Sequence, residues 1–301
     1  MKNILSIGEC MVEMAPRADG AYMRGFAGDT FNAAWYLAKL LPKGATVDYF
    51  TAVGTDAVSG EMLDFMERSG VGTGCIRRIE DRTVGLYMIA LKDGERSFSY
   101  WRGQSAAKRL AADRAALEAA VRGRDLILFS GITMAIIDEA DRGTLLDVLA
   151  EARKAGAVIA FDPNMRLRLW PSLAVMGETI MRAAEVSDMV LPSFDEDGAV
   201  FGDDNPEATI ARYRARGVKT VVVKNGVDTI HARSGTEGAI SFQPTPAENV
   251  VDTTAAGDSF NAGLIAALSR GASLTDAIGQ AAALSARVIA ARGALVDDAV
   301  G

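Results

Sequence analysis

The chain has 301 residues, 49% of them hydrophobic and 24% charged, which is the balance of a globular protein with a sizeable core. Its 32 basic and 39 acidic residues give a formal net charge of −7, and no block of Lys or Arg stands out, so binding to nucleic acid or to an anionic membrane is disfavoured. An anionic substrate would therefore need a local cluster of positive charge.

Cysteine and histidine are too scarce for several kinds of site. Cys10 and Cys75 could form one disulfide but not a disulfide framework, so a reducing cytoplasm is the simpler expectation. His231 is the only histidine, which argues against a catalytic triad and a Cys/His metal site. Glu9 interrupts the apolar N-terminus, which favours a first strand over a signal peptide, and no run of about 18 uninterrupted apolar residues predicts a membrane-spanning helix.

The first seventy residues predict strands and helices with one irregular interruption. Residues 13–27 are expected to be irregular because they contain Pro16, Gly20 and Gly25. Around them we expect strands at 3–7 and 47–53, a helix from 28–32 to 41, a loop at 54–59 and a helix at 61–69.

Residues 74–105 break this alternation. Thr83–Leu91 and Arg96–Trp101 are rich in aromatic and β-branched residues, and Lys92-Asp93-Gly94-Glu95 between them predicts a hairpin turn. We expect a small sheet outside the main sheet that acts as a lid, to which residues 10–26 add a strand.

From about residue 110 the pattern is strand followed by helix. Strands are expected at 126–130, 158–161, 189–191, 220–224, 229–232 and 239–242, and helices at 138–155, 174–186, 206–216, 257–270 and 274–292. Repeated strand–helix units predict an α/β fold with a doubly wound, mainly parallel sheet flanked by helices. We expect one domain over residues 1–301, with lid strands inserted at about 10–26 and 80–105.

Five polar loops are expected beyond the carboxyl ends of the strands, where such sheets bind ligands: 28–32, 162–166, 193–196, 224–226 and 252–258. In the last of them Ala255, Ala256 and Gly257 are small enough to let an anion approach the free N–H groups of a helix start. Asp258 follows in the first turn. It either complements the helix dipole, as first-turn acids commonly do, or acts as a general base beside an anion-binding turn.

Two arginines are candidates for binding a carboxylate. Arg102 ends the predicted hairpin, and Arg166 follows a predicted strand. Each could simply be a solvated surface residue. If both face one cleft, they would clamp a carboxylate, for which the planar guanidinium is well shaped. A P-loop is excluded because the chain has no Gly-Lys-Ser/Thr pattern.

The string Asp252-Thr-Thr-Ala-Ala-Gly-Asp-Ser-Phe-Asn-Ala-Gly263 resembles the signature of the ribokinase-like (pfkB-type) carbohydrate kinases, roughly Asp-Thr-x-Gly/Ala-Ala-Gly-Asp-x-Phe-x-Ala-Gly. The likeness runs nearly end to end and is closest to the 2-keto-3-deoxygluconate kinase branch. The other segments that carry it are 7–11, 24–32, 94–102, 162–170 and 221–226.

The resemblance implies a sugar kinase that uses ATP and Mg²⁺ to phosphorylate the terminal (C6) hydroxyl of 2-keto-3-deoxygluconate. It implies Asp258 as the base, with an anion hole formed by Ala255, Ala256 and Gly257. It implies a sugar site formed by Gly28, Asn32, Tyr87, Tyr100, Trp101, Arg102, Arg166 and Asp258. It implies an ATP site formed by Asn164, Ser193, Lys224, Gly226 and Gly257, with Glu196 reaching Mg²⁺ through water.

Three departures from the family pattern are visible. Ala27 replaces the first of two paired glycines, Ser193 replaces the Asn of an Asn-x-x-Glu motif, and Ala294 stands where some relatives carry an acid. The resemblance also implies a cytoplasmic dimer that pairs through the lid. A fructokinase or other neutral-sugar kinase of the same fold stays open as an alternative. A non-catalytic binding protein is disfavoured because it would not need Asp258.

Overall fold

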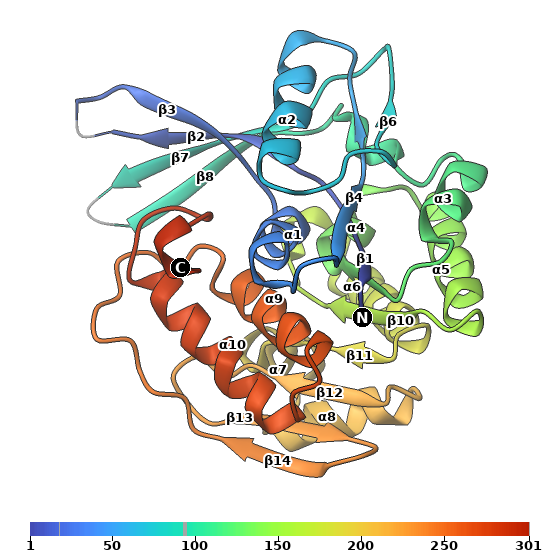
Figure 1. Cartoon of the computed structure of the whole chain (residues 1–301), viewed down its shortest axis with the longest axis vertical. Helices are drawn as coiled ribbons and strands as arrows, with labels where there is room; N and C mark the ends of the chain where they lie inside the picture. The colour runs from blue at the N-terminus through green and yellow to red at the C-terminus, as the bar shows by residue number, and fades with distance from the viewer. Residues whose placement is uncertain (18, 93–94, 301) are drawn as a thin grey trace.

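The computed structural model describes residues 1–17, 19–92 and 95–300 (Figure 1). Within them the main sheet has the strand order β14-β13-β12-β11-β10-β9-β1-β4. The strands from β4 to β12 pair in parallel, whereas β13 and β14 run antiparallel at one edge. The bounds are β1 (Asn3–Ile7), β4 (Thr46–Phe50), β9 (Leu126–Ser130), β10 (Val158–Asp162), β11 (Met189–Val190), β12 (Thr220–Val223), β13 (Ile230–Ser234) and β14 (Gly238–Phe242).

Neighbouring residues of the central strands pack into different hydrophobic cores. Ile4 and Leu126 belong to the cluster on one face of the sheet, whereas Leu5 and Ile127 belong to the cluster on the other. This alternation follows from the two-residue period of a strand, and each fully buried Leu or Ile contributes about 1.5–3 kcal/mol. Both faces of the sheet are therefore covered, as the continuous apolar strands predict.

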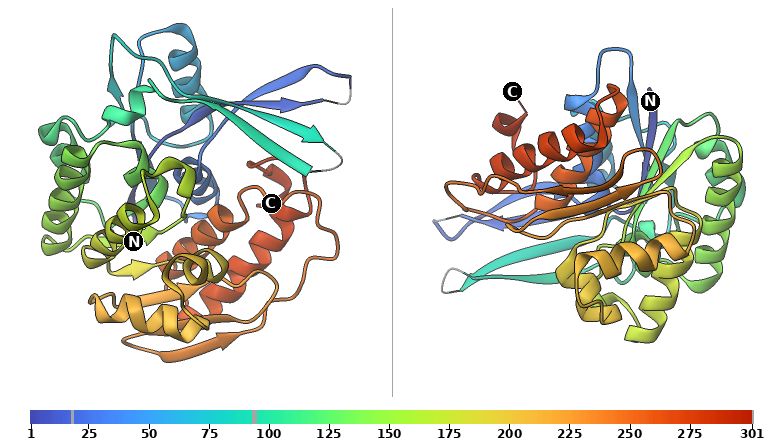
Figure 2. Two further views of the ribbon diagram at one scale, coloured as in Figure 1. Left: turned by 180° about the vertical axis from the view of Figure 1, so that it is seen from behind. Right: turned by 90° about the horizontal axis from the view of Figure 1, so that it is seen from below.

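Helices cover each face, as Figure 2 shows in its view from below. One face carries α1 (Asp29–Leu40), α2 (Ala57–Arg68), α9 (Ala256–Ser269) and α10 (Leu274–Ile289). The other carries α3 (Arg114–Val121), α4 (Gly131–Ile136), α5 (Glu139–Lys154), α6 (Leu173–Glu185), α7 (Phe194–Phe201) and α8 (Pro206–Ala215). The predicted doubly wound α/β fold is thus confirmed. No helix in the described part of the chain is both long and apolar enough to span a membrane.

A second, four-stranded sheet projects from the body of the molecule (Figure 1). Its order is β3-β2-β7-β8, formed by β2 (Met11–Pro16), β3 (Tyr22–Ala27), β7 (Leu86–Lys92) and β8 (Glu95–Trp101). The predicted pairing of the last two strands is confirmed, and it is antiparallel. Residues 93–94 of the predicted hairpin turn lie outside the described residues.

The prediction that residues 13–27 are irregular is wrong. They contribute most of an antiparallel pair that runs from Met11 opposite Ala27 to Pro16 opposite Tyr22, so this region gives the lid two strands and not one. Pro16 is the last residue of its strand, where the missing N–H costs little, and Gly25 sits inside β3 opposite Glu13.

Several short elements also differ from prediction. The strand expected at 47–53 is split into β4 and β5 (Ala52–Val53), and β5 pairs with β6 (Arg77–Arg78). Residues 57–59 are not loop, because Asp56 accepts a hydrogen bond from the Ser59 N–H and starts α2 early. Three helices of eight residues or fewer, α3, α4 and α7, were not predicted, and neither were three 3₁₀ helices: η1 (Ala106–Arg109), η2 (Leu167–Leu169) and η3 (Asp297–Ala299).

Candidate active site

Each of the five polar loops expected at the strand ends contacts at least one other. Asn32 reaches Asp258, and Asn164 reaches Asp29. Glu196 accepts a hydrogen bond from the Met165 N–H, which joins loops 193–196 and 162–166. The loops after β11 and β12 lie side by side through a bridge between Ser193 and Lys224, and the Phe194 N–H donates to the Lys224 carbonyl at 2.8 Å. The carboxyl ends of the strands thus form one polar site.

The first turn of α9 lies within this site. Ala255 precedes the helix in the left-handed conformation, with φ 59°, and the helix begins at Ala256. The first N–H groups of a helix have no intrahelical acceptors and carry the positive end of its dipole. Lys224 adds a full charge, because a Cβ on Gly257 would lie 3.5 Å from the Lys224 ammonium. The turn is therefore electropositive and suited to an anion such as phosphate.

Asp258 lies half-buried in this turn. Its Oδ2 accepts a 2.8 Å hydrogen bond from the Asn32 side-chain amide. Burial, followed by the nearby charge of Asp29, raises the pKa of Asp258 to about 8; Asp162 adds to the rise, and Asn32 and Lys224 oppose it. A carboxyl group with a pKa this near neutrality is poised to exchange a proton with a bound hydroxyl.

This pKa gives a testable prediction for Asp258. If Asp258 is the general base of a reaction, it works as the carboxylate, so kcat/KM should rise about tenfold per pH unit below pH 8 and level off above it. The stability effect has the opposite sign. Because the pKa of Asp258 is raised in the folded state, its proton stabilises the fold below the ordinary pKa near 4, and that stabilisation is lost as the pH rises through 8. Initial rates and thermal unfolding between pH 5 and 9 check both expectations. A kcat/KM that does not change with pH would contradict the first expectation. Asp258→Asn should abolish the contribution of Asp258 to the pH dependence of stability.

Three aspartate–asparagine pairs lie in this site, and one of them contacts the Lys224 ammonium. Besides Asp258 with Asn32, they are Asp29 with Asn164 at 2.9 Å and Asp162 with Asn261 at 2.6 Å. The Lys224 ammonium donates to Asp162 and to Asn261, at 3.3 Å each. Sequence analysis gave no role to Asp29, Asp162 or Asn261. Only the fold brings together residues so far apart in the chain.

Arg166 forms an ion pair with Glu196 on the rim of this cluster. Burial alone would lower the pKa of Arg166, but Glu196, Asp162 and Asp29 together raise it. Both carboxylate oxygens of Glu196 are occupied, because the second accepts from the Met165 N–H at 2.9 Å. In the described part of the chain no group of three or more His, Cys, Asp or Glu side chains is arranged to hold a metal ion. A Mg²⁺ ion held mainly by phosphate oxygens and water, with one carboxylate in support, fits this arrangement.

Arg102 lies in a separate cluster at the base of the lid. Its guanidinium pairs with the carboxylate of Glu9 and lies 5.9 Å from the ring centre of Tyr100. Tyr87 packs 5.9 Å from Tyr100 and donates to the carboxylate of Glu13. The two arginines are thus held by different carboxylates, Glu9 and Glu196, and their meeting in one cleft stays a prediction.

Trp101 and Gly28 complete the predicted sugar site. Trp101 is 59% exposed, and it points to the opposite face of β8 from its neighbour Tyr100 because side chains alternate along a strand. Gly28 donates its N–H to Asn32 at 3.2 Å. A Cβ at Gly28 would lie 2.0 Å from the Glu9 carbonyl oxygen, so only glycine fits there. Gly28 therefore holds Asn32, and through it Asp258, close to the lid.

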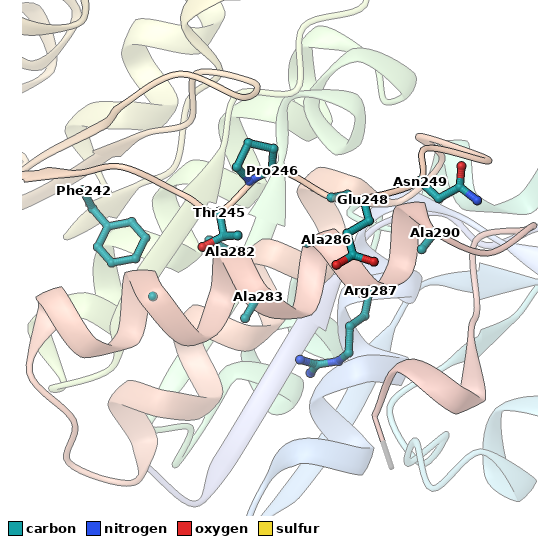
Figure 3. Close-up of a pocket in the computed structure, with 12 residues that line it drawn as sticks. Phe242, Thr245, Pro246, Glu248, Asn249, Ala282, Ala283, Ala286, Arg287 and Ala290 are labelled. Atoms are coloured by element: carbon teal, nitrogen blue, oxygen red, sulfur yellow. The ribbon is translucent and has the colours of Figure 1, made fainter.

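A pocket of about 430 Å³ lies where the loop after β14 passes over α10 (Figure 3). Phe242, Thr245 and Pro246 cover it from the loop side. Its floor consists of small residues of α10 and of the residue after it: Gly279, Ala282, Ala283, Ala286 and Ala290. The Ser285 hydroxyl donates to the Ala256 carbonyl at 3.0 Å, which places the pocket beside the α9 turn.

Sequence analysis missed this pocket. None of the residues predicted for ATP binding line it. The available signal was the row of small residues on the last helix, for which only a helix at 274–292 was predicted.

An electropositive helix start, an ammonium group over it and a half-buried carboxylate beside it are the parts that an enzyme transferring an anionic group needs. Comparison with known proteins makes the class specific. The family model described as "pfkB family carbohydrate kinase" matches residues 1–298, so the chain belongs to this family and is a sugar kinase. The predicted family is confirmed.

Relatives of known name cover almost the whole chain. The 2-dehydro-3-deoxygluconokinase of Escherichia coli (strain K12) is 38% identical over 301 residues, which cover 98% of this chain and 97% of the relative. The enzyme of the same name from Haemophilus influenzae is 36% identical over 302 residues, covering 99% and 96%. Among solved structures, a fructokinase with bound ATP from Xylella fastidiosa superposes with a TM-score of 0.83 at 23% identity, covering 97% of this chain and 93% of the other. That likeness confirms the fold.

Proposed function

We propose that this sugar kinase transfers the terminal phosphoryl group of ATP to the C6 hydroxyl of 2-keto-3-deoxygluconate, giving 2-keto-3-deoxy-6-phosphogluconate. The full-length similarity to 2-dehydro-3-deoxygluconokinases, another name for such enzymes, supports this substrate. The observation that carries the chemistry is Asp258, held by Asn32 in the first turn of α9 with the Lys224 ammonium over the same turn.

In the proposed mechanism Asp258 accepts the proton of the C6 hydroxyl as the hydroxyl oxygen attacks the terminal phosphorus of ATP, and the bond from that phosphorus to ADP breaks so that ADP leaves. The N–H groups of Ala255 and Gly257 would stabilise the negative charge that develops on the phosphoryl oxygens, and Lys224 would add its positive charge. The Ala256 N–H, the third member of the predicted anion hole, donates to the Thr253 carbonyl at 3.2 Å. Mg²⁺, when bound, would neutralise part of the negative charge of the phosphates. Glu196 would hold it through water, because both its carboxylate oxygens already have protein partners.

The pocket over α10 is our candidate for the adenine site. Its floor of small residues leaves room for a flat ring, and Phe242 and Pro246 provide apolar contacts. Ser285 ties α10 to Ala256, so a nucleotide lying in the pocket would direct its phosphates toward the α9 turn. Asn164, Ser193, Lys224 and Gly226 would then face the phosphates and not the base.

Arg102 and Arg166 are our candidates for holding the carboxylate of the sugar acid. The chain carries a net charge of −7, so an anionic sugar needs local cations to offset the general repulsion. Tyr87 and Tyr100 would pack against the sugar chain beside Arg102. We place the enzyme in the cytoplasm, where ATP is available; both Cys10 and Cys75 are free thiols.

The direct test is a coupled assay of ADP release with a panel of acceptors. The purified enzyme, with ATP and Mg²⁺, should phosphorylate 2-keto-3-deoxygluconate far more efficiently than fructose, ribose or glucose. Product analysis should locate the phosphate at C6. An enzyme that prefers a neutral sugar would contradict the proposed substrate and leave the family assignment intact.

We further propose that two copies of the chain pair through the lid. The described lid strands expose large apolar side chains, including Met23 at 60% and Trp101 at 59% exposed, and such patches mark interaction surfaces. Sedimentation at micromolar concentration should therefore show a dimer. Met23→Glu should shift it toward monomer, whereas Val227→Glu, at a 65% exposed site in a loop after β12, should not. A monomeric wild-type protein would contradict the pairing.

A further inference from the structure

A buried ion pair joins the start of the chain to the lid. Glu9, just after β1, is 2% exposed and pairs with the Nη2 group of Arg102, whose side chain is 12% exposed. Within the described part of the chain, Glu9 Oε1 and Arg102 Nε are buried and have no hydrogen-bond partner. Burying two charges and leaving two of their polar atoms unpaired costs free energy that the attraction between the charges offsets only in part.

The backbone around Glu9 fits closely against this pair. A Cβ at Gly85 would lie 2.9 Å from Glu9 Oε1 and 3.2 Å from the Arg102 Cβ, so the side chains of the pair lie directly against the Gly85 backbone. The Glu9 carbonyl oxygen in turn lies against Gly28, which binds Asn32 and so leads to Asp258. Glu9 therefore lies between the start of α1, which carries Asn32, and Arg102 at the base of the lid.

A well-packed apolar pair in this place would be about as stable or more stable, so stability alone does not explain why the chain keeps Glu9 and Arg102 there. Charge alone does not explain it either, because Glu9 neutralises the charge of Arg102. What Glu9 does provide is orientation. By accepting one N–H of Nη2 it fixes the plane of the guanidinium, and this plane sets the direction in which the other N–H groups point.

We propose that Glu9 is a positioning residue that fixes the Arg102 guanidinium so that its remaining N–H groups bind the carboxylate of the sugar acid. This inference rests on the proposed function, because it takes a sugar acid as the substrate. Glu9 itself does not touch the substrate. Its effect on sugar binding passes entirely through Arg102.

A double-mutant cycle tests this role. Glu9→Gln keeps the size of the side chain and removes its charge, so the KM for 2-keto-3-deoxygluconate should rise roughly tenfold, within the usual coupling of contacting residues. The KM for ATP should change less than twofold. Arg102→Ala should raise the sugar KM at least as much, and adding Glu9→Gln to it should have no further effect. Glu9→Asp, which keeps the charge but shortens the reach, should also raise the sugar KM and serves if Glu9→Gln does not fold.

A buried ion pair elsewhere provides the matched control. Asp197 is 0% exposed and pairs with Arg212 between α7 and α8. Asp197→Asn should lower the melting temperature without changing the sugar KM, which separates a general loss of stability from a loss of positioning.

The outcomes distinguish a failure of the positioning role of Glu9 from a failure of the proposed function. If Arg102→Ala raises the sugar KM and neither Glu9 variant does, the positioning role is wrong and the substrate proposal stands. Additive effects of Glu9→Gln and Arg102→Ala would also overturn it. If the wild-type enzyme does not phosphorylate the sugar acid at all, the proposed function itself fails.

Discussion

Asp258→Asn is expected to lower kcat by roughly 10²–10⁴-fold, the usual contribution of a general base, while sugar and ATP binding stay largely intact. Asn has the size of Asp and can still bond to Asn32, but it cannot accept the proton of the attacking hydroxyl. Steady-state kinetics and ligand titration by calorimetry measure the two effects separately.

The matched control is another acid in the first turn of a helix. Asp276 occupies that position in α10, where it contacts Ser273 outside the candidate site. Asp276→Asn removes the same charge from a helix start and should leave kcat unchanged. If Asp258→Asn turns over at a near-normal rate, then Asp258 only complements the helix dipole and another group must be the base.

The sequence predicted the doubly wound sheet because its signal is local and repeated. Strands such as Leu126–Ser130 are buried on both faces, and a helix follows most of them. The hydrophobic period and the length of each segment therefore predict the same type of element. The lid was harder to predict. Pro16 and Gly25 lie in β2 and β3 at positions that only the pairing of the two strands makes acceptable, and no local pattern contains that information.

The candidate site likewise contains residues that the sequence could predict and residues that it could not. Asp258 and its small-residue turn lie in one continuous string, so sequence alone could single them out. Glu9 could not be linked to Arg102 in advance, because they are 93 positions apart and a buried carboxylate has no signature without its partner. The pocket over α10 was hidden for a different reason. A helix face lined with alanine and glycine has the same sequence whether another helix or a ligand covers it.

Arg166→Ala distinguishes a sugar-acid kinase from a neutral-sugar kinase. Removing one arginine from a substrate carboxylate leaves that charge underpaired, which costs about 2–5 kcal/mol in buried charge pairs. The Arg166 side chain is 48% exposed, so solvent screens part of this loss and the lower end applies. Arg166→Ala should thus weaken binding of the sugar acid by about 2 kcal/mol, which corresponds to a roughly 30-fold rise in its KM. The KM for ATP should change much less.

The control and the opposing outcome use the same loop and the same assay. Arg168→Ala removes an equal charge two residues away, in the exposed helix η2, and should leave the sugar KM within twofold because a solvated charge is screened. A neutral analogue without the carboxylate should be a poor substrate of the wild-type enzyme and should respond little to Arg166→Ala, because it offers the guanidinium no charge to bind. If fructose or ribose is instead phosphorylated as efficiently as 2-keto-3-deoxygluconate, Arg102 and Arg166 do not form a carboxylate clamp, and the enzyme is a neutral-sugar kinase of the same family.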